Sequence, residues 1–105
     1  LSTFNFEDDE ISGSYDVIVI CNWIHKFQPD YLRQKFEKMY KFNLNHEGEI
    51  IFDIIERATP FHPYAHSVEN LNSLIHAQVT EIGRYIIKNS NFEILHRQVL
   101  SLKKI

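Results

Sequence analysis

The residues best suited to chemistry are concentrated in two polar segments, each of which follows an apolar run. The run "YDVIVI", residues 15–20, passes abruptly into "CNWIHKF", which brings an amide, an indole and an imidazole at Asn22, Trp23 and His25. An interior strand needs no such ending, whereas a binding crevice uses polar and aromatic groups of this kind. The first segment therefore indicates a ligand-binding loop at the end of a buried element.

The second segment is "ERATPFHPYAH", residues 56–66, which follows the apolar run "EIIFDII". His62 and His66 are four residues apart, a spacing that on a helix would place two imidazoles on one face, as in zinc proteases. Pro60 and Pro63 interrupt such a helix, and no glutamate follows the first histidine. We therefore predict no metal here, and we assign the two histidines to the surface or to an acceptor pocket.

Two strands and one helix must position these segments. The runs at residues 15–20 and 49–55 are rich in β-branched residues, as in strands that are covered on both faces. Between them, Pro29 suits a first helical turn, and "DYLRQKFEKMYKFNL" repeats apolar residues at helical spacing. "NHEG" breaks this helix, and Gly48 gives the turn its conformational freedom. The pattern predicts a βαβ unit with parallel strands, which places both polar segments at the carboxyl edge of an open α/β sheet, where ligands bind.

The rest of the chain predicts one more helix and one more strand. Ser67 is a suitable N-cap for a helix over residues 68–90, whose apolar residues form a continuous stripe. The segment "FEILHRQVLSLKKI", residues 92–105, predicts a strand that is antiparallel or at the edge, and a hairpin is the alternative. We therefore expect the order β-α-β-loop-α-β in a doubly wound, mostly parallel sheet. Residues 1–105 are expected to form a single partial α/β domain.

Composition restricts the partners of the chain. A chain of 105 residues with a net charge of −3 has room for one domain and no basic field for nucleic acid. No apolar run approaches the ~20 residues that cross a bilayer, and no leader precedes the first element. The single cysteine, Cys21, follows an apolar run, which predicts a buried thiol in a reducing compartment. We expect a cytoplasmic protein with neither nucleic acid nor membrane as a partner.

The order of these motifs resembles the fourth strand, following helix and fifth strand of the class I S-adenosylmethionine (SAM)-dependent methyltransferases. The resemblance is carried by the strand start Tyr15-Asp16, by the loop at residues 21–25 and by the turn at residues 44–48, which leads into "EIIFDII". The tail "IIKNSNFEILHRQVL" is similar to the family's step into its sixth strand. The resemblance implies a Rossmann-like methyltransferase sheet.

Other signatures of that family are missing from the sequence. The family has a glycine-rich loop and an acidic strand end for the cofactor ribose, but the three glycines of this chain form no G-x-G arrangement. The resemblance therefore implies the C-terminal half of a methyltransferase domain. Such a half would not methylate alone, and it would leave a strand edge and a sheet face uncovered. Both features favour association, including the formation of homo-oligomers.

The resemblance implies that the first segment contacts the cofactor. It places the adenosyl and methionine parts of SAM against Cys21, Asn22 and Trp23, and a further match adds Asn5, which precedes "FEDDE". An aromatic side chain next to an amide suits a purine and a sulfonium. In the alternative reading, Trp23 packs against the following helix and Asn22 caps a turn.

Histidines are the residues that we expect to bind the methyl acceptor or to take its proton. Methyl transfer mainly requires alignment of donor and acceptor, and a base that takes the acceptor's proton assists it, a role that suits His25. His62 and His66 are expected in the acceptor-binding loop. Alternatively, His25 only forms hydrogen bonds within its loop. Asp53, inside an apolar strand, must be paired with a donor; it would either shape the acceptor site or form a structural pair.

The sequence therefore predicts a SAM-dependent methyltransferase portion that acts on a small-molecule, sugar or lipid-type acceptor. The alternative is a non-catalytic α/β module used for dimerisation or scaffolding. A nucleotide- or flavin-binding half of another doubly wound fold is disfavoured, because the phosphate-cradling loop is missing.

Overall fold

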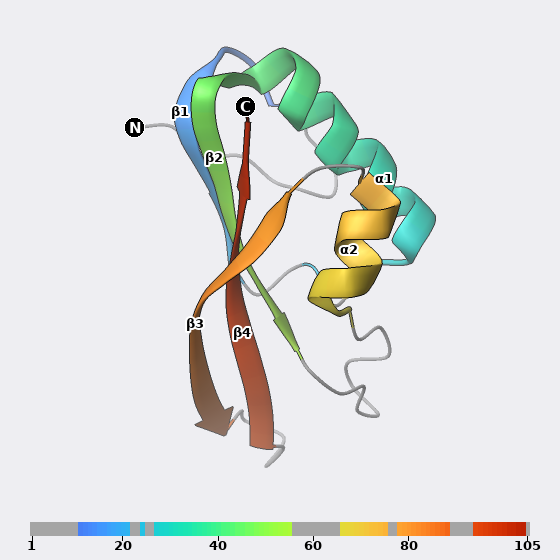
Figure 1. Cartoon of the computed structure of the whole chain (residues 1–105), viewed down its shortest axis with the longest axis vertical. Helices are drawn as coiled ribbons and strands as arrows, with labels where there is room; N and C mark the ends of the chain where they lie inside the picture. Colours follow the sequence, from blue (N-terminus) through green and yellow to red (C-terminus); the bar gives the residue numbers. More distant parts are fainter. Residues whose placement is uncertain are drawn as a thin grey trace.

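The computed structural model describes residues 11–21, 24, 27–55, 66–75, 78–88 and 94–104. Its elements, in chain order, are β1 (Tyr15–Ile20), α1 (Pro29–Lys38), a π-helical turn (Met39–Asn43), β2 (Leu44–Ile55), α2 (Val68–Ile75), β3 (Val79–Lys88) and β4 (Ile94–Lys103) (Figure 1). No helix among these residues is long and apolar enough to cross a membrane.

The four strands form one sheet with the order β1-β2-β4-β3. β1 pairs with β2 in parallel, and β4 pairs with both β2 and β3 in antiparallel fashion. β1, β2 and β3 therefore run in one direction and only β4 runs against them. The predicted α/β class with a βαβ start is confirmed, in a mixed sheet with one parallel and two antiparallel pairings.

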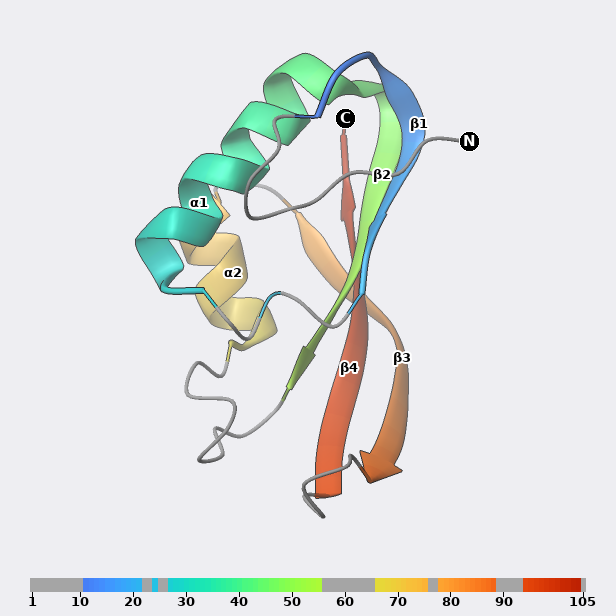
Figure 2. The ribbon, with the colours of Figure 1, turned by 180° about the vertical axis from the view of Figure 1, so that it is seen from behind.

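Both described helices pack on the same face of the sheet, as two opposite views show (Figures 1 and 2). α1 buries Leu32 and Phe36, and the Phe36 ring contacts the ring of Phe52 from β2 at 4.9 Å between centroids. Ile18 and Ile20 of β1 join this core. Successive side chains of a strand point to opposite faces of the sheet, however, so Val17 and Val19 point away from the helices. They remain 48% and 55% exposed. The expectation that β1 is covered on both faces is therefore wrong for the described residues.

The expected helix over residues 68–90 is also wrong, because it ends at Ile75 and β3 follows. Its start is as predicted: the backbone N–H of Asn70 donates to the Ser67 hydroxyl at 3.1 Å. Near its end, the Asn72 side-chain oxygen accepts a hydrogen bond of 2.7 Å from the backbone N–H of Val79. This bond joins the last turn of α2 directly to the first residue of β3, so the chain turns into the sheet.

The predicted turn at "NHEG" is present as an irregularity inside β2 rather than as a separate loop. The register shifts between Tyr15↔Leu44 and Val17↔Glu49, so four residues of β2 lie opposite one residue of β1. Glu47 takes the left-handed conformation, with φ 64°, in this bulge.

The last segment is one strand, not a hairpin, and it is antiparallel as expected. It is not an edge strand, because β4 lies between β2 and β3. Its pairing with β2 begins at Ile55↔Arg97, whereas its pairing with β3 continues to Lys88↔Ile94. The β3–β4 hairpin therefore extends beyond the end of β2, as the lower part of Figure 1 shows.

Candidate functional site

The carboxyl ends of β1 and β2 lie at the same edge of the sheet, because the two strands are parallel neighbours. The pairing Ile20↔Phe52 places the last residue of β1 beside a residue near the end of β2. The polar segments that follow the two strands therefore leave from one edge, which is where ligands bind in open α/β sheets. This edge is the candidate site.

The structure describes two of the residues that the sequence assigned to the site, Cys21 and His66. The others lie outside the described residues and stay predictions: Asn5, Asn22, Trp23, His25 and His62. Among the described residues no three His, Cys, Asp or Glu side chains gather where they could hold a metal ion.

His66 joins the second polar segment to the first. Its side chain is buried, with 5% of the residue exposed, and it hydrogen-bonds with the backbone of Phe27 and Ile24, which follow β1. Burial lowers the pKa of the imidazole, and the two backbone contacts partly oppose this effect. Nε2 has no hydrogen-bond partner in the described part of the chain. His66 is therefore a mostly neutral imidazole with one unused nitrogen, beside the loop that follows β1.

Cys21 is exposed, so the prediction of a buried thiol is wrong. The residue lies one position beyond β1, and the strand alternation turns it to the face that carries Val17 and Val19 rather than into the core. Partial desolvation raises the pKa of the Cys21 thiol, the charge of Asp53 adds to this, and Arg97 opposes it. The thiol is therefore protonated at neutral pH and is a weak nucleophile.

Asp53 has the donors that its burial requires. The Tyr85 hydroxyl donates a hydrogen bond of 2.7 Å to Asp53 Oδ2, and Arg97 Nη1 lies 3.4 Å from the same oxygen. The Asp53 and Arg97 side chains are only 6% and 4% exposed. Burial, followed by the bond to Asp53 and its negative charge, raises the pKa of Tyr85 to about 12. These three residues, the Asp53 cluster, connect β2, β3 and β4 near the candidate edge.

Sequence reasoning predicted a partner for Asp53 but did not identify Tyr85 and Arg97. The apolar spacing places Tyr85 in a helix, and an arginine in a strand gives no signal of burial by itself. The signal that could have found Arg97 is the need of a buried aspartate for a cationic donor on a neighbouring strand.

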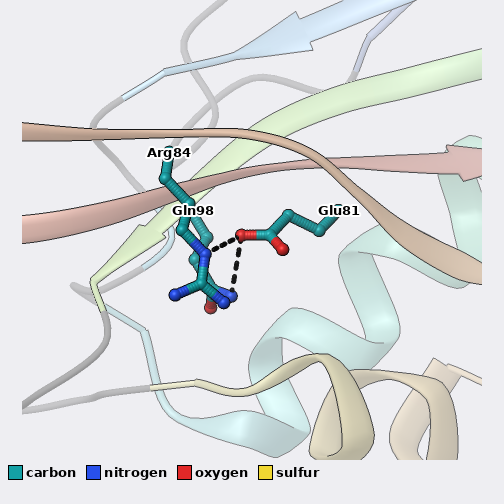
Figure 3. Close-up of polar contacts among 3 residues, drawn as sticks. All are labelled: Glu81, Arg84 and Gln98. Carbon is teal, nitrogen blue, oxygen red and sulfur yellow. Dashed lines mark hydrogen bonds and ion pairs between the residues drawn. The ribbon is translucent and has the colours of Figure 1, made fainter.

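A second polar group, formed by Glu81, Arg84 and Gln98, links β3 to β4 (Figure 3). Arg84 Nε and Gln98 Nε2 both donate to Glu81 Oε1, the latter at 3.2 Å. The hydrogen bond from Arg84, more than the bond from Gln98, lowers the pKa of Glu81. All its members lie on the surface, so we interpret this group as cross-strand stabilisation rather than as a ligand site.

A shallow hollow of about 430 Å³ lies on the β3–β4 hairpin, lined by Arg84, Tyr85, Ile86, His96 and Arg97. It is bounded by the two polar groups described above, whose cations already have carboxylate partners. His96 is exposed. We do not assign this hollow to the candidate site.

No protein-family model matches the chain, and no curated protein is significantly similar to it in sequence. Solved structures are similar to it in fold. The N-methyltransferase NodS of Bradyrhizobium japonicum, in complex with S-adenosylhomocysteine (SAH), has a TM-score of 0.64 at 18% identity over 98% of this chain and 53% of its own. A putative O-methyltransferase of Nostoc punctiforme has a TM-score of 0.59 at 20% identity over 94% and 34%.

The magnesium protoporphyrin IX methyltransferase ChlM of Synechocystis, with bound SAM, has a TM-score of 0.60 at 9% identity and matches 91% of this chain and 42% of its own. The chain thus spans between about a third and a half of the length of these three structures. At such identities the similarity concerns the fold. The chain therefore has the fold of part of a class I SAM-dependent methyltransferase domain.

Proposed function

We propose that this chain is the portion of a SAM-dependent methyltransferase that forms one wall of the cofactor pocket and part of the acceptor pocket. One observation carries the proposal: the parallel strands β1 and β2 end at a common edge, within a fold that matches methyltransferases crystallised with SAH or SAM. Ligands of open α/β sheets bind at this edge.

The state of one described residue at this edge supports the proposal. Bound SAM supplies an activated methyl group on a positively charged sulfonium. Cys21, the residue next to the end of β1, has a thiol whose raised pKa keeps it protonated, so this wall offers no thiolate that would compete for the methyl group. In the proposal, Asn22 and Trp23 contact the adenosyl and methionine parts, and Asn5 contributes to the adenine side.

The acceptor pocket is proposed to lie where the two polar segments meet. His66 lies against the backbone of Ile24 and Phe27, which brings the second polar segment to the first. His25 is proposed as the base that takes the acceptor's proton, and His62 as a further acceptor contact. The absence of a basic surplus in the sequence favours a small-molecule, sugar or lipid-type acceptor over nucleic acid.

Isothermal titration calorimetry with SAH tests the proposal, on the natural full-length polypeptide and on the 105-residue chain. We expect SAH to bind to the full-length polypeptide, and we expect Trp23→Ala to abolish the heat of binding because it removes the proposed adenosyl contact. Phe42→Ala is the control, because this aromatic side chain is 65% exposed on the π-helical turn that precedes β2. The candidate edge lies at the other end of β2. If the full-length polypeptide gives no binding, the cofactor proposal is wrong.

A non-catalytic α/β module that serves in dimerisation or scaffolding is the second candidate, because one sheet face of the described chain carries exposed valines. The coding sequence upstream of Leu1 discriminates between the two. A strand, a G-x-G turn and an acidic strand end there support the methyltransferase. Their absence supports the module.

A further inference from the structure

His66 is a buried titratable residue to which the proposed methyl transfer assigns no chemical step. Only 5% of the residue is exposed, although it ends the irregular segment of residues 56–66. A polar side chain buried to this extent is unfavourable unless it forms hydrogen bonds. The partners of its ring nitrogens therefore indicate its role.

The hydrogen bonds of His66 go to the backbone on either side of His25. The side chain bonds with the backbone of Ile24 and Phe27, and Nε2 has no partner in the described part of the chain, so Nδ1 makes these contacts. Both contacts raise the pKa of the ring, as they do when a ring N–H donates to a backbone carbonyl. His66 is therefore an imidazole that carries its proton on Nδ1 and donates it to this backbone.

The two backbone partners are themselves fixed to the rest of the fold. The Ile24 side chain is fully buried in the core. The backbone N–H of Phe27 donates to the carbonyl of Ile24 at 3.3 Å, and the Phe27 ring stacks on that of Tyr31 from α1 at 5.0 Å between centroids. These contacts define a turn over residues 24–27. His25 belongs to this turn, so a fixed position of both ends restricts where His25 can lie.

His66 in turn is held by the start of α2. It directly precedes Ser67, whose hydroxyl accepts a hydrogen bond of 3.1 Å from the backbone N–H of Asn70. The Ser67 carbonyl accepts a bond of 2.9 Å from the backbone N–H of Leu71, a fully buried residue. α2 also packs beside α1, as both views show (Figures 1 and 2). The imidazole is therefore supported by a regular element, which holds a geometry more precisely than a loop does.

We infer that His66 is a positioning residue: its hydrogen bonds tie the turn after β1 to the start of α2 and so hold the segment that carries His25 and follows Trp23. The inference rests on the proposed function for the roles of those two residues, whereas the tie itself does not depend on it. The tie requires a neutral ring. Protonation at Nε2 would place a charge and an N–H without an acceptor inside the core.

Acid should therefore loosen the turn. Burial lowers the pKa of His66 below its ordinary value of 6.5, and opening of the turn restores that value. Below pH 6.5 the opened state binds more protons than the closed state, so its population rises by up to about tenfold for each pH unit. Other titratable groups flank the contacts along the chain: His25, Lys26, Asp30, Tyr31 and Glu69. A variant without the His66 ring retains all of them, so the difference isolates His66.

Amide hydrogen exchange, measured by NMR on the natural full-length polypeptide, tests the tie without a cofactor. His66→Leu removes the donor and keeps a side chain of similar size, whereas His66→Asn provides an amide N–H near Nδ1 without a titratable ring. We expect His66→Leu to lower the protection factor of the Phe27 amide roughly tenfold and His66→Asn to keep it within about threefold. The Lys104 amide, which donates to the Gly48 carbonyl at 2.8 Å, reports overall stability and should lose less protection than Phe27.

A pH series separates the charge of the ring from its shape. From about pH 7.5 to about pH 5.5, Phe27 should lose up to about tenfold more protection in the unmodified polypeptide than in His66→Asn. Equal losses in these two polypeptides overturn the inference. Equal losses at Phe27 and Lys104 in His66→Leu overturn it as well, because His66 then only adds to overall stability. If His66→Leu does not fold, the comparison with His66→Asn decides.

Calorimetry with SAH on the same polypeptides tests the consequence for the site. At about pH 7.5 we expect His66→Leu to weaken SAH binding roughly tenfold and His66→Asn to weaken it less than about threefold, because only the first releases the segment that follows Trp23. Unchanged SAH affinity in His66→Leu, despite a loss of protection at Phe27, overturns the positioning role. Absence of SAH binding to the unmodified polypeptide contradicts the proposed function instead, and exchange at Phe27 still decides whether the tie exists.

Discussion

At the scale of single residues, burial decides what each polar side chain does. Asp53 lies within an apolar strand, and a carboxylate in that position is stable only when donors surround it. That requirement was predictable from the sequence, and Tyr85 and Arg97 fulfil it. The exposure of Cys21 was not predictable, because it depends on which sheet face the helices cover.

Loss of the Asp53 carboxylate should remove the negative charge that faces the buried guanidinium of Arg97. Asp53→Ala is expected to lower the free energy of unfolding by about 3–5 kcal/mol, measured by urea denaturation. The control is Glu37→Ala, which breaks the exposed Arg33–Glu37 pair and should cost less than about 1 kcal/mol. A loss for Asp53→Ala as small as that of the control would contradict the assigned pairing.

The raised pKa of Tyr85 predicts a loss of stability in alkali. The folded protein holds this proton up to a pKa of about 12, whereas an unfolded tyrosine releases it near pH 10. Between these values the folded state binds more protons, so the stabilisation is complete below about pH 10 and decreases as the pH rises towards 12. Urea midpoints measured over this range should fall more steeply for the unmodified chain than for Tyr85→Phe. Parallel curves would argue against the Tyr85–Asp53 hydrogen bond.

At the scale of elements, the sequence predicted β1, α1, the core of β2 and β4, because their apolar residues repeat with the period of the structure they adopt. It failed at β3. The apolar residues across α2 and β3 recur at helical spacing, which imitates a helix: Leu71, Leu74, Ile75, Val79, Ile82 and Ile86. β3 is an edge strand of the described sheet, and its end lies beyond β2. Most of its residues are therefore exposed whichever face they point to, so β3 shows no alternation of buried and exposed residues. Pairing with β4 overrode the local pattern.

Two glycines in strands should respond oppositely to the same substitution. A Cβ on Gly48 would lie 2.8 Å from the Asn45 carbonyl oxygen and 2.9 Å from that of Asp16, so Gly48→Ala should destabilise by about 1–3 kcal/mol. Nothing lies within 4 Å of a Cβ on Gly83, so Gly83→Ala should be neutral or stabilise by up to about 1 kcal/mol. Thermal unfolding of the two variants compares them. Equal effects would contradict the crowded bulge at the start of β2.

At the scale of the whole molecule, the position of the candidate site was predictable and its geometry was not. A βαβ pattern fixes the edge at which two loops meet, since parallel strands end together. The meeting of His66 with Ile24 and Phe27 depends on the path of an irregular segment, for which the sequence gives no periodic signal. The exposure of the sheet face that carries Val17 and Val19 was not predictable either, because it depends on where the helices lie.

β4 lies between β2 and β3, so the stability of the entire sheet should depend on β4. A chain that ends at residue 90 loses the strand that joins β2 to β3, and we expect it to show no cooperative unfolding transition by circular dichroism. A chain that ends at residue 104 retains β4 and serves as the control. A cooperative transition in the shorter chain would show that β4 is dispensable.

The central position of β4 also affects synthesis on the ribosome. β1, α1 and β2 leave the ribosome before β3 and β4 and form a local βαβ unit, but β3 has no partner among the described strands until β4 has been translated and has inserted between β2 and β3. Up to that moment the nascent chain exposes the strand edges of both β2 and β3. Late insertion of the middle strand therefore makes the translation of β4 the period in which a chaperone would matter most.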